Sequence, residues 1–409
     1  MKKSLVLSVM VSSVLLAGES TPPVAPVNTG SFGNALENGK FTANLRAFYF
    51  DRSFDEDVTG NPDAKALTAG GIIKYESAEY NGLKFGLAHY SSTRLGNTFS
   101  REEGKGTSIL GRSGENLAFL GEAYLQYDVG NTMLKVGRQQ LSTPLMQNHD
   151  LRILPSVYEA AIIRNKDIPN TMVEVGFVDR YSGFTSKDNG FTDNKTGKDG
   201  LASLSFTNKS IDNLAIRGQY IKALTDGVSR ETYTYLDGKY NVPIGKNTYV
   251  KAQYGGNTYL SEEDSTLFGT KVGTTVGMFD VAAVYDKVSG YRFQAFESGP
   301  MYTDWQQGYG NYEASTAIGG QVVVKPMSGL SLKLGYVDVG ADSGNLRDDF
   351  SEFNFDGKYT INDWSKIRVR YSIKDQSDES EANRGGVNPN GSTGREDRND
   401  FRIIYYMSF

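Results

Sequence analysis

Apolar and polar side chains alternate with a period of two along most of the chain. The clearest case is residues 366–374, where Ile367 and Val369 fall on one face and Arg368 and Arg370 fall on the other. No long stretch shows the 3.6-residue period of an amphipathic helix. Such alternation predicts β-strands with one apolar face and one polar face.

Turn signals divide the chain into eighteen predicted strands. Tight turns such as Asn81-Gly82 alternate with long polar loops such as residues 183–200 and 375–399. A soluble sandwich does not sort its connections into a short and a long set, whereas outer-membrane barrels do. The predicted strands start near Phe41, Ala66, Gly82, Asn116, Thr132, Val157, Thr171, Leu201, Asn213, Glu231, Asn247, Asp264, Phe279, Glu313, Gly329, Phe350, Ser365 and Asp400.

We therefore predict an all-β fold, a transmembrane antiparallel β-barrel with short periplasmic turns and long external loops. An even number of strands brings both chain ends to the periplasmic side, as a closed single-chain barrel requires. Sixteen strands is the alternative, because the segments near Glu231 and Glu313 alternate weakly.

The amino-terminal residues have the pattern of an export signal. Lys2 and Lys3 precede an uncharged apolar stretch over residues 4–16, and small residues follow it. We predict a signal peptide over residues 1–18, an amino-terminal segment of the mature chain over residues 19–38, and the barrel over residues 39–409.

Composition agrees with exported strands and excludes several classes of protein. The chain has 409 residues, with 25 Tyr, 21 Phe and 46 Gly but only 38% hydrophobic residues, which excludes a polytopic helical membrane protein. The absence of Cys excludes disulfides, thiol chemistry and Cys-based metal sites. The formal net charge of −5 argues against a nucleic-acid partner.

Two stretches resemble the OprD-type outer-membrane porins, a family of 18-stranded channels. One is the predicted first strand, residues 44–54. The other is more distinctive and runs from Val136-Gly137-Arg138-Gln139-Gln140 to Leu145, continuing into residues 150–160. The resemblance implies that this second stretch contains an external loop that folds into the pore and narrows it. It also implies a ladder of basic wall residues that guides solutes bearing carboxylates.

A charged side chain that faces lipid costs about 2–4 kcal/mol at the bilayer midplane, so we assign the charged parity of each strand to the lumen. Basic residues outnumber acidic ones in that inward set. The basic residues predicted for the pore wall are Arg46, Arg164, Arg180, Arg217, Lys366, Arg368, Arg370 and Arg402. We expect Arg46, Arg368, Arg370 and Arg402 to line one contiguous sector, because the first and last strands of a closed barrel must pair.

The predicted constriction loop spans residues 142–156. Its apolar residues, among them Leu145 and Leu154, need a surface to pack against, which favours an inward fold. Deletion of residues 146–151 is expected to raise conductance. The constriction residues that we single out are Pro144, Met146, His149, Asp150 and Arg152.

The predicted function is passive diffusion of small polar solutes across the outer membrane of a Gram-negative cell, with carboxylate-bearing solutes such as amino acids or organic acids as candidates. Two alternatives are a structural or adhesive barrel and an outer-membrane hydrolase. Neither His89 nor His149 has a plausible catalytic partner, so no enzyme is predicted.

No cofactor is predicted. Acidic loop clusters, residues 262–264 and 378–381, could hold Ca²⁺, but solvated loop charge is the favoured interpretation. The expected partners are small polar solutes, ions and outer-membrane lipid. A monomer and a homotrimer both stay open as assemblies.

Overall fold

The computed structural model describes residues 30–54, 63–96, 107–111, 114–148, 152–183, 190–193, 195–243, 247–296, 300–303, 305, 314–341, 349–376 and 397–409. The described elements are α1 (Phe32–Glu37), β1 (Lys40–Phe54), β2 (Ala64–Glu76), β3 (Leu83–Arg94), β4 (Leu117–Val129), β5 (Thr132–Gln139), β6 (Val157–Asn165), β7 (Thr171–Ser182), β8 (Leu201–Asn208), β9 (Leu214–Ala223), β10 (Arg230–Val242), β11 (Thr248–Tyr259), β12 (Ser265–Val276), β13 (Phe279–Ser289), β14 (Ser315–Met327), β15 (Leu330–Ala341), β16 (Phe350–Asn362), β17 (Ser365–Gln376) and β18 (Arg398–Ser408).

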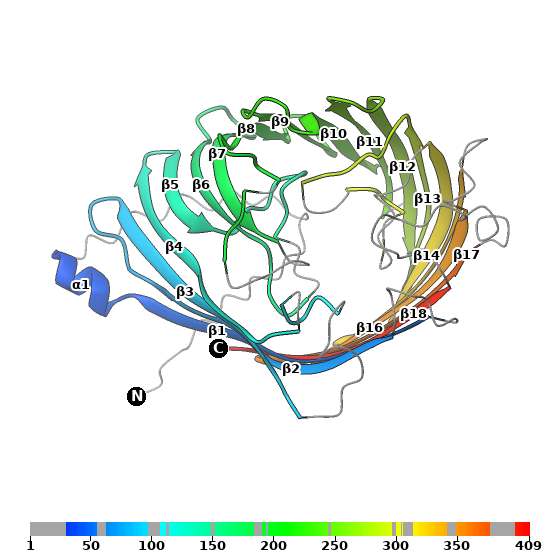
Figure 1. Ribbon diagram of the computed structural model, residues 1–409, viewed down its shortest axis with the longest axis horizontal. Helices are drawn as coiled ribbons and strands as arrows, with labels where there is room; N and C mark the ends of the chain where they lie inside the picture. Colours follow the sequence, from blue (N-terminus) through cyan, green and yellow to red (C-terminus); the bar gives the residue numbers. More distant parts are fainter. Residues whose placement is uncertain are drawn as a thin grey trace.

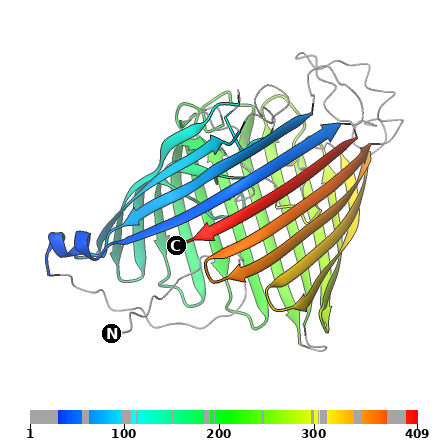
Figure 2. The ribbon, with the colours of Figure 1, turned by 90° about the horizontal axis from the view of Figure 1, so that it is seen from below.

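All 18 strands belong to one antiparallel sheet that closes on itself. Each strand pairs with its neighbours in sequence, and β1 pairs with β18 from Asn44↔Ser408 to Phe54↔Arg398. Figure 1 shows the resulting ring, and Figure 2 shows the tilted strands with β1 and β18 side by side. The predicted all-β barrel with eighteen strands is confirmed, and each strand starts within two residues of its predicted position.

Tight turns join the strands at one end of the barrel. At Asn81-Gly82 both residues have positive φ, 49° and 83°, which is the backbone that a two-residue hairpin turn with the natural strand twist requires. The carboxyl-terminal strand ends at this same end (Figure 2). By the architecture of outer-membrane barrels this end is periplasmic, and the longer loops are external.

Alternation gives the wall an apolar outer face and a polar inner face. On β12, Phe268 and Val272 are exposed to the outside, whereas Lys271 between them points to the lumen. Exposed apolar side chains of this kind occur on almost every strand, and they form the lipid-facing belt. In the described residues no helix is long and apolar enough to cross a membrane.

A β-bulge changes the facing of one predicted wall residue. The pairing of β6 with β7 shifts between Glu159↔Arg180 and Ala160↔Val178, so Asp179 is an extra residue. The extra residue reverses the alternation that follows it. The prediction that Arg180 faces the lumen is therefore wrong, because its side chain lies on the outward face at the external end of β7.

The outward position of Arg180 is stabilised by ion pairs at the external rim. Glu159 Oε2 lies 2.6 Å from Arg180 Nη2, and Glu159 Oε1 accepts a hydrogen bond from Arg138 Nε at 2.7 Å. The adjacent residues Tyr158 and Tyr181 face the other way, and their side chains are buried inside the barrel. Charged groups are tolerated outside the barrel at this level because the rim lies beyond the hydrocarbon band.

Candidate functional site

The wall where β17, β18 and β1 meet carries several of the predicted basic side chains. Arg370 on β17 is the register partner of Arg402 on β18, and Arg402 is the register partner of Phe50 on β1. All three side chains are inward and buried. We call Arg46, Arg368, Arg370 and Arg402, together with Arg152 from the loop between β5 and β6, the arginine seam.

Two carboxylates on the same wall neutralise part of the seam. Asp356 accepts a hydrogen bond from Arg368 Nε at 2.8 Å and another from Arg368 Nη2. Asp400 accepts from Arg402 Nη2 at 2.8 Å and from Arg52 Nε at 2.7 Å. These hydrogen bonds leave other nitrogens of the seam to be satisfied.

Within the described part of the chain, Arg370 and Arg402 each keep two guanidinium nitrogens without an acceptor. Arg370 is 4% exposed and Arg402 is 0% exposed, and Nε and Nη1 of both have no hydrogen-bond partner among the described residues. Arg370 Nε lies 3.9 Å from Asp356 Oδ2, and its Nη2 donates to the carbonyl of Trp305 at 3.4 Å, which is long. A buried donor without an acceptor costs about 1–3 kcal/mol, so the seam favours a ligand that brings acceptors.

Arg152 adds a further positive charge from the loop. Its carbonyl accepts a hydrogen bond from Arg46 Nη1, and its guanidinium lies 5.5 Å from the ring centre of Phe50. Burial and the charges of Arg402 and Arg52 lower the pKa of Arg152 below its ordinary value. The ionised seam is therefore destabilised by its own charge, and an anion would relieve that repulsion.

The described parts of the loop between β5 and β6, residues 140–148 and 152–156, lie inside the barrel. The backbone N–H of Leu145 donates to Gln219 Oε1 of β9 at 2.7 Å, and the carbonyl of Leu145 accepts from the backbone N–H of Phe296 at 3.0 Å. Towards its other end, Ile153 packs in the same cluster as Phe50 of β1. The loop thus reaches from β9 to the arginine seam.

A second loop, between β13 and β14, is fastened to the wall by Asp286. The buried Asp286 carboxylate of β13 accepts from the backbone N–H and the hydroxyl of Thr303 at 2.8 and 2.7 Å, and from Gln253 Nε2 at 2.6 Å. Phe293 and Phe296 of this loop pack in the same hydrophobic cluster as the first loop.

The sequence prediction missed the inward fold of this second loop. The available signal was the same as for the first loop, apolar residues within a polar loop, here Phe293, Phe296 and Met301. The loop matters for the site because Trp305 contacts Arg370 and lies 5.2 Å below the Lys333 ammonium.

Three lysines on β10, β11 and β12 form a second basic region. Lys239 is the register partner of Lys251, and Lys251 is the register partner of Lys271. The Tyr249 ring centre lies 5.3 Å from the Lys239 ammonium and 5.9 Å from that of Lys251. We call the three the lysine patch. Lys239 was not assigned to the lumen from the sequence.

Other predicted wall residues have acidic partners of their own. Arg164 Nη2 lies 2.6 Å from Glu174 Oε2, and Arg217 Nε donates to Asp237 Oδ1 at 2.9 Å. Lys366 lies on the inward face of β17, beside the seam.

Of the predicted constriction residues, Pro144 and Met146 are buried in the first loop and Arg152 belongs to the seam. His149 and Asp150 lie outside the described residues. Within the part of the chain that the structure describes, no group of three His, Cys, Asp or Glu side chains could hold a metal ion.

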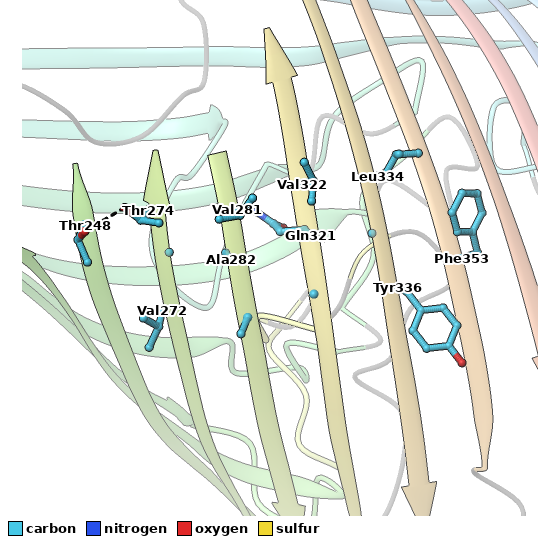
Figure 3. Close-up of a pocket in the computed structure, with 14 residues that line it drawn as sticks. Thr248, Val272, Thr274, Val281, Ala282, Gln321, Val322, Leu334, Tyr336 and Phe353 are labelled. Carbon is cyan, nitrogen blue, oxygen red and sulfur yellow. Dashed lines mark hydrogen bonds between the residues drawn. The ribbon is translucent and has the colours of Figure 1, made fainter. Parts of the chain in front are cut away.

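A groove of about 670 Å³ lies on the wall of β11–β16. Figure 3 shows side chains that line it, among them Val272, Val281, Leu334 and Tyr336. These side chains belong to the outward parity and are exposed, so the groove faces lipid and is separate from the seam.

A closed barrel of 18 antiparallel strands, with charges on its inner wall and loops folded inside, has the architecture of an outer-membrane channel. A family model described as outer membrane porin, OprD family, matches residues 34–317, which is more than half of the chain. The chain therefore belongs to the OprD family of outer membrane porins. The family indicates a channel rather than an enzyme.

Solved structures with the same fold cover nearly the whole barrel. OccAB3 of Acinetobacter baumannii is 17% identical, with a TM-score of 0.76 over 91% of this chain and 100% of that chain. A BenF-like porin from Pseudomonas fluorescens is 16% identical, with a TM-score of 0.76 over 92% and 100%. OpdO of Pseudomonas aeruginosa is 18% identical, with a TM-score of 0.72 over 92% and 98%. Comparison with curated protein sequences yields no match.

Proposed function

We propose that this porin favours solutes with a carboxylate group among the small polar solutes that it passes across the outer membrane. The observation that carries the proposal is the pair Arg370 and Arg402, which are buried yet keep guanidinium nitrogens without partners in the described structure. A carboxylate offers two acceptor oxygens in a plane, the geometry that a guanidinium group fits best.

Transit requires that the solute leave the seam again. A single tight site would trap it, whereas several neighbouring weak sites permit it to pass from one to the next. Arg370 and Arg402 are register partners on adjacent strands, and Lys366 lies further along β17 towards the periplasmic end. The wall therefore offers successive positive positions along the pore.

Removal of Arg370 tests the proposal. Arg370→Gln should reduce the flux of a small carboxylate into proteoliposomes by about tenfold relative to a neutral solute of equal size, since a charge-assisted hydrogen bond contributes about 1.5–3 kcal/mol. The reversal potential in a salt gradient should also shift towards cation selectivity.

Arg217→Gln is the matched control, because it removes an inward arginine that already has a carboxylate partner. It should change the reversal potential without a large change in the ratio of carboxylate to neutral flux. Equal losses of both fluxes in Arg370→Gln would show that this arginine only shapes the pore.

We also propose that residues 1–18 direct export and are removed, and that the porin assembles as a homotrimer. Residues 1–29 lie outside the described residues, so the support for export is the charge and hydropathy pattern alone. Amino-terminal sequencing of the purified protein tests the first point, and chemical cross-linking in native membranes tests the second.

A further inference from the structure

The short helix α1 lies outside the ring of strands, beside the periplasmic part of the wall (Figures 1 and 2). Ser31 caps it by accepting a hydrogen bond from the backbone N–H of Asn34, and Asn38 ends it. A helix of six residues is not stable by itself in water, so contacts elsewhere must hold it in place.

Two hydrogen bonds tie α1 to the wall. The Tyr75 hydroxyl of β2 donates to the carbonyl of Leu36 at 2.5 Å, and the backbone N–H of Ala78 donates to the carbonyl of Ala35 at 3.0 Å. Gly39 permits this approach, because a Cβ at that position would collide with the Tyr75 ring. The helix is therefore docked against the periplasmic end of β2 through its last turn.

Tyr75 fixes the level of the helix relative to the membrane. Its ring lies between Phe41 and Phe85 on the outward face, with centroid distances of 4.9 and 5.8 Å. Phe41 is 76% exposed. Aromatic residues at the periplasmic ends of the strands form the girdle that lies at the membrane–water interface. A helix bound to a girdle tyrosine lies at that same interface.

The free face of α1 is apolar. Phe32 is 57% exposed and Leu36 is 39% exposed, and the spacing of four residues places both on one face of the helix. Ala35, on a neighbouring face, is buried, and Glu37 is exposed. Phe32 also contacts the Tyr80 ring edge to face at 6.2 Å, so the apolar surface continues from the helix to the turn after β2.

We propose that α1 is an interfacial anchor whose Phe32 and Leu36 side chains insert into the inner leaflet of the outer membrane. The occupant of this surface is phospholipid, because the apolar face is continuous with the lipid-facing belt through Phe41 and Tyr75. The helix contains no basic residue, so apolar burial, and not attraction to anionic headgroups, provides the binding. Since α1 leads directly into β1, which pairs with β18, the anchor holds the closing strand at a fixed depth.

Single cysteines provide a direct test, because the natural chain has none. Phe32→Cys and Leu36→Cys are purified, spin-labelled and reconstituted into phosphatidylethanolamine vesicles. Both labels should collide with oxygen more often than with a water-soluble nickel complex. The collision frequency with nickel should be lower than for Glu37→Cys, because a polar nickel complex is excluded from the apolar part of the bilayer.

A second variant changes the attachment of the helix to the wall and leaves the labelled position the same. Tyr75→Phe removes the hydroxyl that holds Leu36 but keeps the aromatic ring, so the Leu36→Cys label should become more accessible to nickel in this background. Equal nickel accessibility at positions 32, 36 and 37 in the native background would overturn the anchor. Spin–spin broadening that disappears on dilution with unlabelled porin would overturn it as well, because it would place a second copy on this face.

Discussion

The arginine seam and the lysine patch are both rows of inward basic residues on neighbouring strands, yet they differ in what covers them. Arg370 and Arg402 lie beneath the two inward loops and are almost completely buried. Lys239 and Lys251 lie beside the Tyr249 ring, and all three lysines of the patch stay partly exposed to the lumen. The same charge on the same kind of wall is buried in one region and accessible in the other.

This difference separates two ways in which a wall charge acts on a solute. A partly exposed ammonium group keeps its water and acts at a distance through its field, which salt screens. A buried guanidinium group has lost its water and gains a full hydrogen bond when an acceptor arrives. Under the proposed function, the lysine patch attracts anions in general, whereas the seam selects for the planar geometry of a carboxylate.

The largest effect is expected when the first loop is shortened, because that change exposes the arginine seam to the lumen, as the lysine patch already is. Deletion of residues 146–151 removes Met146 from the hydrophobic cluster and shortens the chain that leads to Arg152. Single-channel conductance should rise roughly twofold or more, since the narrowest part of a pore dominates its resistance. The preference for carboxylates should fall as water reaches the seam. Unchanged conductance would place the loop outside the permeation path.

Exchange of one charge in each region sharpens the comparison. Arg370→Gln should lower carboxylate flux about tenfold relative to neutral flux, whereas Lys251→Gln should lower it about twofold, since an exposed charge contributes about 0–1 kcal/mol. Flux of a carboxylate and of its neutral amide is measured in the same proteoliposomes. If Lys251→Gln had the larger effect, burial beneath the inward loops would not explain the difference between the two regions.

Detachment of the second loop from the wall should expose the arginine seam to water, as the lysine patch already is. Asp286→Ala leaves Thr303 and Gln253 without their acceptor and should destabilise the protein by about 1–3 kcal/mol, measured by unfolding in urea. Because Trp305 of this loop contacts Arg370, the carboxylate preference should fall moderately. The matched control is Asp280→Ala, which removes another inward aspartate of β13 whose described hydrogen bond, from Thr275, is at 3.4 Å.

The smallest effect is expected from alkaline solution. Lysine ammonium groups lose their proton at lower pH than guanidinium groups do, because the ordinary pKa of lysine is lower than that of arginine. Overall anion selectivity should therefore decrease as the pH rises, while the ratio of carboxylate to amide flux stays nearly constant. A parallel decrease of both quantities would show that the lysines, and not the seam, recognise the carboxylate.

Much of the fold could be predicted because barrel strands carry local information. Alternation and turn signals placed every strand start within two residues, even for β10 and β14, which were judged weak. The alternation failed at Arg180, where a bulge at Asp179 reverses the facing. A bulge is specified by the pairing of two strands, so the pattern within one strand does not reveal it.

The site was only partly predictable. The apolar residues of the first loop indicated its inward fold, and closure of the barrel placed Arg46, Arg368, Arg370 and Arg402 in one sector. The sequence did not indicate which arginines have partners. Arg368 donates hydrogen bonds to Asp356, whereas Arg370 Nε lies 3.9 Å from the same carboxylate and donates none to it, although both were assigned to the lumen by the same parity.

By itself, the sequence determined the barrel, the starts of its strands and its lipid-facing belt, because these follow from a period of two and the energy of charge in lipid. Tertiary structure decided which inward charges are buried, which are paired, and that Asp286 and Tyr75 fasten a loop and a helix to the wall. The reason is distance along the chain: these contacts join residues on different strands and loops, and only closure of the barrel brings them together.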